Sequence, residues 1–184
     1  MELIEALTQT FDHTTKIVSG VRTGQLDSPT PCRDWELRAL LAHTIGVVMN
    51  MGLGASGRDL LDSVNAISLA DDPGAQFRAQ ADRTLAAWIA HGPNGEVNIG
   101  AGPMPVSAGL SINVLDTATH SWDIARATGQ DPNLPDLLAT TVLAVAREVV
   151  TDEIRGFAGF DPVAPVSDNA GPTDRLVAFL GRRP

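Results

Sequence analysis

The hydrophobic and polar positions of the chain follow a helical period over most of its length. Apolar residues recur every three or four positions, which predicts helices over residues 2–19, 34–52, 74–90, 107–128 and 135–155, with a last short helix over 173–180. A further short helix is expected over residues 58–64. Between residues 95 and 106, glycine and proline interrupt the period, and this segment predicts at most a small strand or hairpin.

The second of these helices has the clearest pattern. Asp34 is a suitable N-cap residue, and Glu36 adds negative charge to the first turn, where the helix dipole favours it. The inward-facing positions follow at i, i+3, i+4, i+7, i+8 and i+11, and are Leu37, Leu40, Leu41, Thr44, Ile45 and Val48. The glycines at positions 52, 54 and 57 are expected to end the helix.

Long helices joined by connectors that can reverse the chain predict an all-α fold, a four-helix bundle with short additional helices. At 184 residues the chain has the size of one domain. We therefore expect a single helical domain over residues 1–184.

The helix expected over residues 107–128 carries two stripes. Its apolar stripe consists of Leu110, Val114, Ala118, Trp122 and Ala125. A polar stripe on the opposite side consists of Asn113, Asp116, His120 and Asp123, which lie within about 80° of one another at 100° per residue. Ile112 and Ile124 border the polar stripe, so exposing it to water would tend to expose them too.

Two interpretations of the polar stripe are open. It is either a face exposed to water or a buried stripe, but water-exposed faces usually contain Lys, Glu or Arg, and this one holds only short side chains. Buried carboxylates and imidazoles need partners, and a metal ion inside a helical bundle supplies them. Asp116 and His120 stand four residues apart on one face, so both can reach a single ion at roughly 2.0–2.2 Å.

A third ligand must come from another helix. The candidates are His43, His13 and His91. The pattern alone favours ordinary half-buried histidines at positions 43 and 13, and at position 91 an imidazole stabilises the helix C-terminus. The three tryptophans, Trp35, Trp88 and Trp122, are expected in the core, with Trp122 beside the proposed site.

Composition and charge restrict the classes of function. The chain has 13 Lys plus Arg against 22 Asp plus Glu, a net charge of −9. This argues against nucleic acid or an anionic membrane surface as a partner, because both bind clustered positive charge. No apolar run approaches the roughly 18 residues of a membrane span, and the N-terminus does not resemble a secretory signal.

The single cysteine, Cys32, cannot form an internal disulfide, which indicates a reducing compartment, the cytoplasm. A buried packing role is the favoured interpretation of Cys32. A reactive thiol beside a helix N-terminus is the alternative.

Three segments resemble a known family. TPCRDWELRALLAHTIG (residues 30–46) and DTATHSWDIARATGQDP (residues 116–132) are similar to signature segments of the actinobacterial metal-binding proteins related to mycothiol-dependent maleylpyruvate isomerase. That group belongs to the DinB-like helical-bundle superfamily. The closing segment, PVSDNAGPTDRLVAFLGRRP, resembles the tail of its short, single-domain members. The resemblance covers nearly the whole chain and implies a DinB-like bundle that binds a metal ion.

In that family a histidine of an L-x-x-H segment in the second helix holds the metal together with a carboxylate and a histidine four residues apart in a later helix. The matching positions are His43, Asp116 and His120. The resemblance implies a divalent ion, zinc or alternatively nickel, with three protein ligands and an open position. The isomerase has glutamate where this chain has Asp116, and the shorter arm can change metal preference or weaken binding. Asp123 could hydrogen-bond to a ligating imidazole or compete to coordinate the ion.

The isomerase has an additional C-terminal domain that helps to form its active site, and we expect this chain not to contain it. Isomerase activity is therefore not carried over. Three hypotheses remain: a metal-dependent S-transferase that joins a small-molecule thiol of the mycothiol type to an electrophile, a non-catalytic metal-binding or ligand-sensing module, and a bundle with a metal-free polar network. The oligomeric state stays open, with a homodimer among the alternatives.

Overall fold

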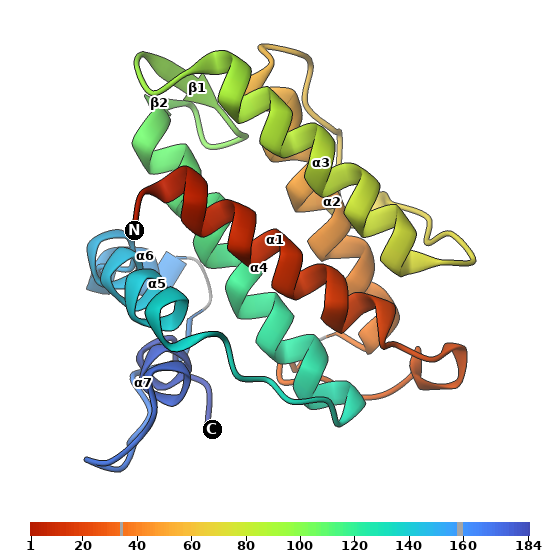
Figure 1. Ribbon diagram of the computed structural model, residues 1–184, viewed down its shortest axis with the longest axis vertical. Coiled ribbons are helices and arrows are strands. Elements are labelled where there is room, and N and C mark those ends of the chain that lie inside the picture. Colours follow the sequence, from red (N-terminus) through yellow and green to blue (C-terminus); the bar gives the residue numbers. More distant parts are fainter. Residues whose placement is uncertain (34, 158–159) are drawn as a thin grey trace. The chain divides into compact units, whose positions relative to one another are not determined.

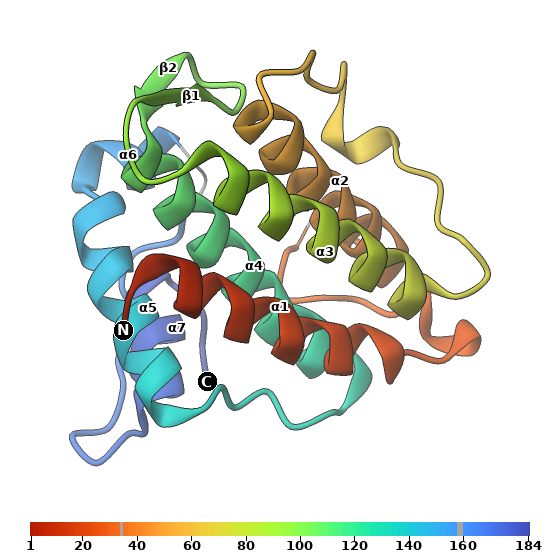
Figure 2. The same cartoon turned by 45° about the horizontal axis from the view of Figure 1, so that its top comes forward.

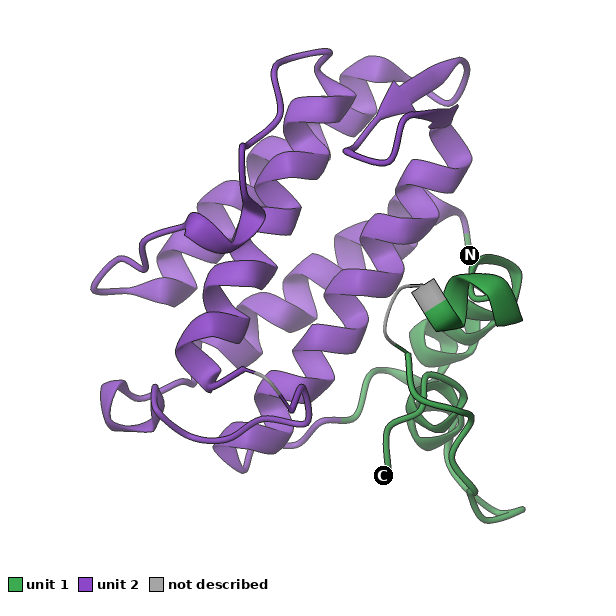
Figure 3. Ribbon diagram, turned by 180° about the vertical axis from the view of Figure 1, so that it is seen from behind, with its two compact units in different colours: residues 1, 133–184 green, residues 2–132 purple. Residues whose placement is uncertain are grey.

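The computed structural model describes residues 1–33, 35–157 and 160–184 (Figure 1). These form two compact units, residues 2–132 and residues 1 and 133–184 (Figure 3). The larger unit contains helices α1 (Leu3–Ser19), α2 (Leu37–Ala55), α3 (Pro73–His91) and α4 (Val106–Thr128), and the smaller unit contains α5 (Asp136–Val149), α6 (Asp152–Phe157) and α7 (Pro172–Phe179). The predicted all-α fold class is confirmed. That the chain is a single domain stays a prediction.

The four long helices of the larger unit pack as a closed bundle. Helix α1 lies against α3 and α4, and α2 lies against the same two helices (Figures 1 and 2). The predicted apolar stripe of α4 is buried at all five of its positions, from Leu110 to Ala125. Burial of such stripes from four sides is what stabilises the bundle.

A two-stranded hairpin connects α3 to α4. Strands β1 (Glu96–Asn98) and β2 (Pro103–Pro105) pair antiparallel, with Val97 opposite Met104. Val97 is buried, whereas its neighbours in β1 are exposed, so the hairpin closes one end of the bundle with a single apolar side chain of this strand. The small hairpin predicted near residues 95–106 is confirmed.

Helix α2 differs from its predicted boundaries at both ends. It begins at Leu37, with Glu36 as an extended N-cap residue rather than a member of the first turn. The predicted N-cap, Asp34, lies outside the described residues. At the other end the helix continues through Gly52 and Gly54 to Ala55. A Cβ atom at these two glycines would collide with α3 and with the β1 backbone, so they serve close packing and do not end the helix.

Three further predictions are wrong. The short helix expected over residues 58–64 is not formed: residues 58–63 are not helical, and a 3₁₀ turn, η2 (Val64–Ala66), begins at the last of its positions. Helix α5 ends at Val149, short of its predicted end, because Val150 leaves the helical region at φ −93°, ψ 75°. Ile89, predicted to face inward, is 63% exposed because it lies about 120° from Phe77 around α3.

Helix α2 is also the most apolar of the long helices. Contrary to expectation, its 19 residues and mean hydropathy of 1.2 are sufficient in length and composition for a membrane span. However, 72% of that apolar window is buried inside the protein. This is the pattern of a core helix that packs against its neighbours on several sides.

Candidate metal centre

His43 on α2 meets Asp116 and His120 on α4. Oδ1 of Asp116 lies 3.6 Å from Nε2 of His120 and 4.0 Å from Nε2 of His43. One ligand atom from each residue lies within 4.8 Å of those of the other two. Asp116 and His120 are one helical turn apart and project from one face of α4. The structure thus brings together the three residues predicted as ligands, here called the central triad.

Both histidines of the central triad are held through their Nδ1 atoms. Nδ1 of His43 lies 2.7 Å from Oδ1 of Asn65, and Nδ1 of His120 lies 3.1 Å from Oδ2 of Asp123. An oxygen acceptor at Nδ1 favours the tautomer whose proton is on that nitrogen. In the neutral form of each imidazole, the lone pair of Nε2 is then available on the side that faces Asp116. This is the arrangement that orients metal-binding imidazoles in proteins.

Asn65 reaches His43 because a glycine in α2 admits the η2 turn. The Asn65 amide donates to the hydroxyl of Ser63, which caps the turn. A Cβ atom at Gly46 would overlap the carbonyl oxygen of Val64, so only glycine permits this approach. Gly46 is one turn beyond His43 on α2. The one turn of α2 from His43 to Gly46 therefore carries both the imidazole and the glycine that lets Asn65 approach it.

The central triad is enclosed but not sealed. The side chains of His43, Asp116 and His120 are 14%, 24% and 12% exposed. Oδ2 of Asp116 is inaccessible to water, and among the described residues it has no hydrogen-bond partner. A buried carboxylate oxygen without a partner is costly, and a cation between the three side chains would satisfy it.

Burial and the two nearby acids act in opposite directions on the histidines. Burial lowers the pKa of His43, and the attraction of Asp116 only partly offsets this effect. For His120, burial also lowers the pKa, but Asp116, Asp123 and Cys32 together raise it to about 10. Without a metal ion, His120 therefore carries a proton at neutral pH. That proton supplies the positive charge that the neighbouring carboxylates require.

Trp35 covers one side of the central triad. Its ring centroid lies 4.4 Å from that of His43 and 6.1 Å from that of His120. Trp35 is only half-buried, whereas Trp88 and Trp122 are buried as predicted. Trp122 stacks beneath the guanidinium of Arg126, 5.4 Å from its ring centroid. The tryptophan that contacts the triad is thus Trp35, which the pattern assigned to the core.

The remaining candidates lie apart from the central triad. Asn113, at the start of the polar stripe, accepts a hydrogen bond from the Trp88 indole at 3.0 Å and donates to Thr117. His13 is on α1, near Lys16, and His91 ends α3. Only part of the polar stripe therefore faces the site, and His43 is the histidine from another helix that joins it.

Cys32 lies next to the triad, on the far side of His120. Its Sγ is 3.2 Å from Oδ2 of Asp123 and 3.9 Å from Nδ1 of His120. Cys32 is half-buried rather than fully buried. The pattern alone gave no sign that the cysteine approaches the histidine, because 88 residues separate them.

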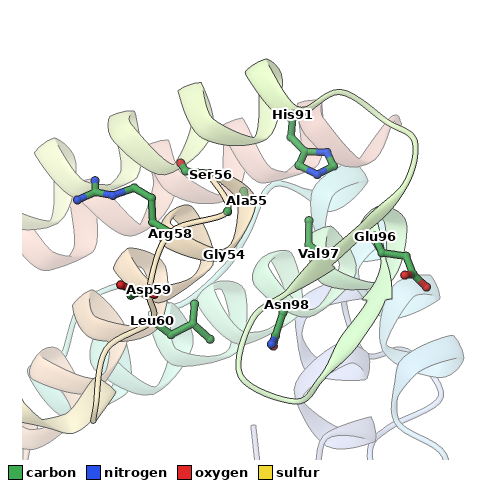
Figure 4. Close-up of a pocket in the computed structure, with 11 residues that line it drawn as sticks. Gly54, Ala55, Ser56, Arg58, Asp59, Leu60, His91, Glu96, Val97 and Asn98 are labelled. Atoms are coloured by element: carbon green, nitrogen blue, oxygen red, sulfur yellow. The ribbon is translucent and has the colours of Figure 1, made fainter.

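A cavity of about 560 Å³ lies at the opposite end of α2 (Figure 4). It is lined by residues 54–60, by His91 and by β1. His43 and Gly54 are eleven residues apart, about 16 Å along a helix. None of the central triad lines this cavity, so it is a separate feature.

Comparisons with known proteins agree with the fold. A family model described as "Mycothiol maleylpyruvate isomerase N-terminal domain" matches residues 7–125, a range that includes all three triad residues. Two uncharacterized proteins of Mycobacterium tuberculosis, MT0763 (strain CDC 1551 / Oshkosh) and Rv0738 (strain ATCC 25618 / H37Rv), are each 31% identical to this chain over 174 residues. The matched region covers 90% of this chain and 90% of each relative.

Among solved structures, the mycothiol-dependent maleylpyruvate isomerase superposes with a TM-score of 0.56 at 17% identity, over 78% of this chain and 68% of that one. A histidine-to-alanine mutant of that isomerase gives the same TM-score at 18% identity. At this level of identity the likeness shows a common fold.

Proposed function

Because the chain belongs to the mycothiol maleylpyruvate isomerase N-terminal domain family, we propose that it binds one divalent metal ion through His43, Asp116 and His120 and acts as a metal-dependent thiol S-transferase. One observation carries the proposal. Two imidazole nitrogens and a carboxylate oxygen converge, while both Nδ1 atoms are engaged by Asn65 and Asp123.

The donor set fits zinc, with nickel as the alternative. Two imidazoles and one carboxylate are typical ligands of a catalytic zinc site, which keeps a fourth position for water or substrate. The partnerless Oδ2 of Asp116 and the two acids around His120 both favour a cation. The partial exposure of the triad side chains leaves access for a small ligand.

Each neighbouring residue has a role in this proposal. A bound divalent ion lowers the pKa of a coordinated thiol, so that a thiolate forms near neutral pH. Asn65 and Asp123 hold the two imidazoles in orientation, and Trp35 offers an aromatic surface beside His43. The thiol is a small molecule of the mycothiol type, and its partner is an electrophile. A reducing cytoplasm suits both the thiol and Cys32.

Element-resolved metal analysis of protein purified without a polyhistidine tag tests the metal. The expected result is about one zinc or nickel ion per chain, lost in His43→Ala and in His120→Ala. His91→Ala is the matched control, because it removes a histidine at the other end of the bundle and should keep the metal. A wild-type protein that neither contains nor takes up a divalent ion would refute the proposal.

Thiol conjugation tests the activity. The zinc-loaded protein should join mycothiol, or a surrogate thiol, to an electrophile faster than the metal-stripped protein does. Equal rates with the metal bound would rule out the transferase. The function would then be a non-catalytic metal-binding or ligand-sensing module that uses the same three residues.

A further inference from the structure

A second group of metal-ligand atoms lies on the opposite edge of the His120 ring. It consists of Sγ of Cys32, Nδ1 of His120 and Oδ2 of Asp123, here called the thiol cluster. We propose that the thiol cluster is a second cation site, which binds a thiophilic metal ion such as Cd²⁺, Co²⁺ or Zn²⁺. This assignment goes beyond the proposed transferase and does not depend on a metal ion in the central triad.

The spacing of the thiol cluster suits a single ion. The three separations are 3.1 Å between Nδ1 and Oδ2, 3.2 Å between Sγ and Oδ2, and 3.9 Å between Sγ and Nδ1. Ligands of a tetrahedral zinc ion, at bond lengths of 2.0–2.3 Å, are separated by roughly 3.3–3.6 Å. Each contact needs a change of only a few tenths of an ångström. The Oδ1–Nε2 separations of the central triad, 3.6 and 4.0 Å, depart from these values by a comparable amount, at most about 0.4 Å.

The chemistry of the thiol cluster selects the class of ion. A thiolate is a soft ligand that prefers zinc, copper(I) and the heavier divalent ions over magnesium or calcium. The Asp123 side chain has no exposed surface, so its charge lies in a low-dielectric environment where a cation is strongly attracted. Binding would displace the thiol proton and the Nδ1 proton of His120 into solvent.

The backbone around Cys32 is held in place before any ion arrives. The Thr30 hydroxyl accepts a hydrogen bond from the Cys32 amide at 3.1 Å, and the Trp35 amide donates to the Cys32 carbonyl at 2.8 Å. Pro29 and Glu36 pair across this turn as an isolated β-bridge. The sulfur is therefore presented by a constrained turn, which lowers the entropy lost on binding.

His120 belongs to both groups of ligands, and this sets a relation between them. Its Nε2 faces the central triad, and its Nδ1 faces the thiol cluster. An ion in the thiol cluster would replace the hydrogen bond from Nδ1 to Asp123 that orients the ring for the triad. A thiophilic ion should therefore weaken binding at the central triad.

Titration of metal-free protein with Co²⁺ tests the thiol cluster by a signal that the central triad cannot give. A cobalt–thiolate bond produces charge-transfer absorption in the near ultraviolet, and Cys32 is the only cysteine. The band should appear in the wild type and in His43→Ala. It should be absent in Cys32→Ser, and it should require at least tenfold more cobalt in Asp123→Asn and His120→Ala. Circular dichroism of each variant checks that it is folded.

The outcomes separate this proposal from the transferase. A band in His43→Ala supports the thiol cluster even if that variant has lost all activity. No band in folded wild-type protein at saturating cobalt would overturn the thiol cluster and leave the central triad unaffected. The thiol cluster would also be overturned if the band appeared at the same cobalt concentration in Asp123→Asn, in His120→Ala and in the wild type. That result would show that Cys32 binds cobalt without the other two ligands. Protection of Cys32 from alkylation by Cd²⁺, but not by Mg²⁺, gives a second readout of the same site.

Discussion

The two ends of helix α2 differ in their surroundings: one lies at the central triad and the other borders a cavity. Near its start, His43 meets Asp116 and His120, whose side chains are at most 24% exposed. Near its end, Gly54 and Ala55 border a cavity of about 560 Å³ whose charged lining residues, among them Arg58 and Glu96, come from separate segments. This cavity is at one end of the helix, and the converging donor atoms are at the other. Fixed orientation of donor atoms, more than empty volume, is what indicates chemistry here.

At both ends of α2, a glycine without a Cβ atom lets another segment of the chain pack closely against the helix. Gly46 admits the η2 turn, which brings Asn65 to His43, and Gly54 admits β1, which closes the cavity end. The difference lies in what each approaching segment carries. One supplies a side-chain acceptor for an imidazole, and the other supplies backbone and an apolar valine.

The largest expected effect separates the two ends directly. Zinc at a thousandfold excess over its dissociation constant should stabilise the wild-type protein by about 4 kcal/mol. His120→Ala should lose this stabilisation, because it removes a ligand of the central triad. His91→Ala, at the cavity end, should keep it. Urea denaturation with and without zinc measures both, and equal zinc responses in the two variants would contradict the assignment.

A smaller effect is expected for the residue that orients His43. Asn65→Ala should weaken zinc binding by about 10–100-fold, because loss of a hydrogen-bonded neighbour frees the imidazole to rotate and protonate differently. Asn98→Ala is the matched control at the cavity end, where its side chain accepts a hydrogen bond from Gly100. Competition with a chromophoric chelator gives the affinities. A loss in Asn98→Ala as large as in Asn65→Ala would show that the effect is not local.

The two glycines allow a sharper comparison on one helix. Gly46→Ala and Gly54→Ala should each lower the free energy of unfolding by about 1–3 kcal/mol, because each new methyl group meets backbone atoms. Only Gly46→Ala should also weaken zinc binding, since it displaces the turn that carries Asn65. Gly24→Ala, where a Cβ atom meets nothing within 4 Å, is the control for substitution alone. If Gly46→Ala left the zinc affinity unchanged, the η2 turn would have no influence on zinc binding.

A further expected effect is a pH dependence of stability that is limited to metal-free protein. Burial lowers the pKa of His120, but the neighbouring acids outweigh this effect and raise the pKa from its ordinary value of 6.5 to about 10 in the folded state. Protonated His120 therefore stabilises the fold fully below pH 6.5, and this contribution is lost as the pH rises toward 10. The loss should not exceed about 1.4 kcal/mol per pH unit, the limit for one proton.

Urea denaturation of metal-free protein between neutral pH and pH 10 measures this dependence. His120→Ala should not show it. Zinc should also suppress it, because a bound ion occupies Nε2 and leaves no second proton to lose. If metal-free wild type and His120→Ala showed a pH dependence of equal size, titrating groups other than His120 would be its cause.

The local pattern of apolar residues was sufficient to predict much of the fold. The period of apolar residues gave α1, α3 and α4 to within one or two residues, because helical spacing is a property of neighbouring positions. It did not give the end of α2 at Ala55 or the break in α5 at Val150. Glycines inside a helix become favourable only when another segment packs against them, and tolerance of β-branched residues also depends on packing.

In the candidate site, too, some residues could be predicted from the sequence and others only from the tertiary structure. Spacing alone paired Asp116 with His120, since residues four apart share a face of any helix. The family resemblance selected His43, which pattern alone left level with His13. Asn65, Trp35 and Cys32 became part of the site only through the tertiary structure, which brings together segments up to 91 residues apart in the chain. The sequence by itself determined most of the helices and the pairing of Asp116 with His120, because both depend on local geometry. Only the folded chain decided what surrounds them, because loops have no period from which their approach can be read.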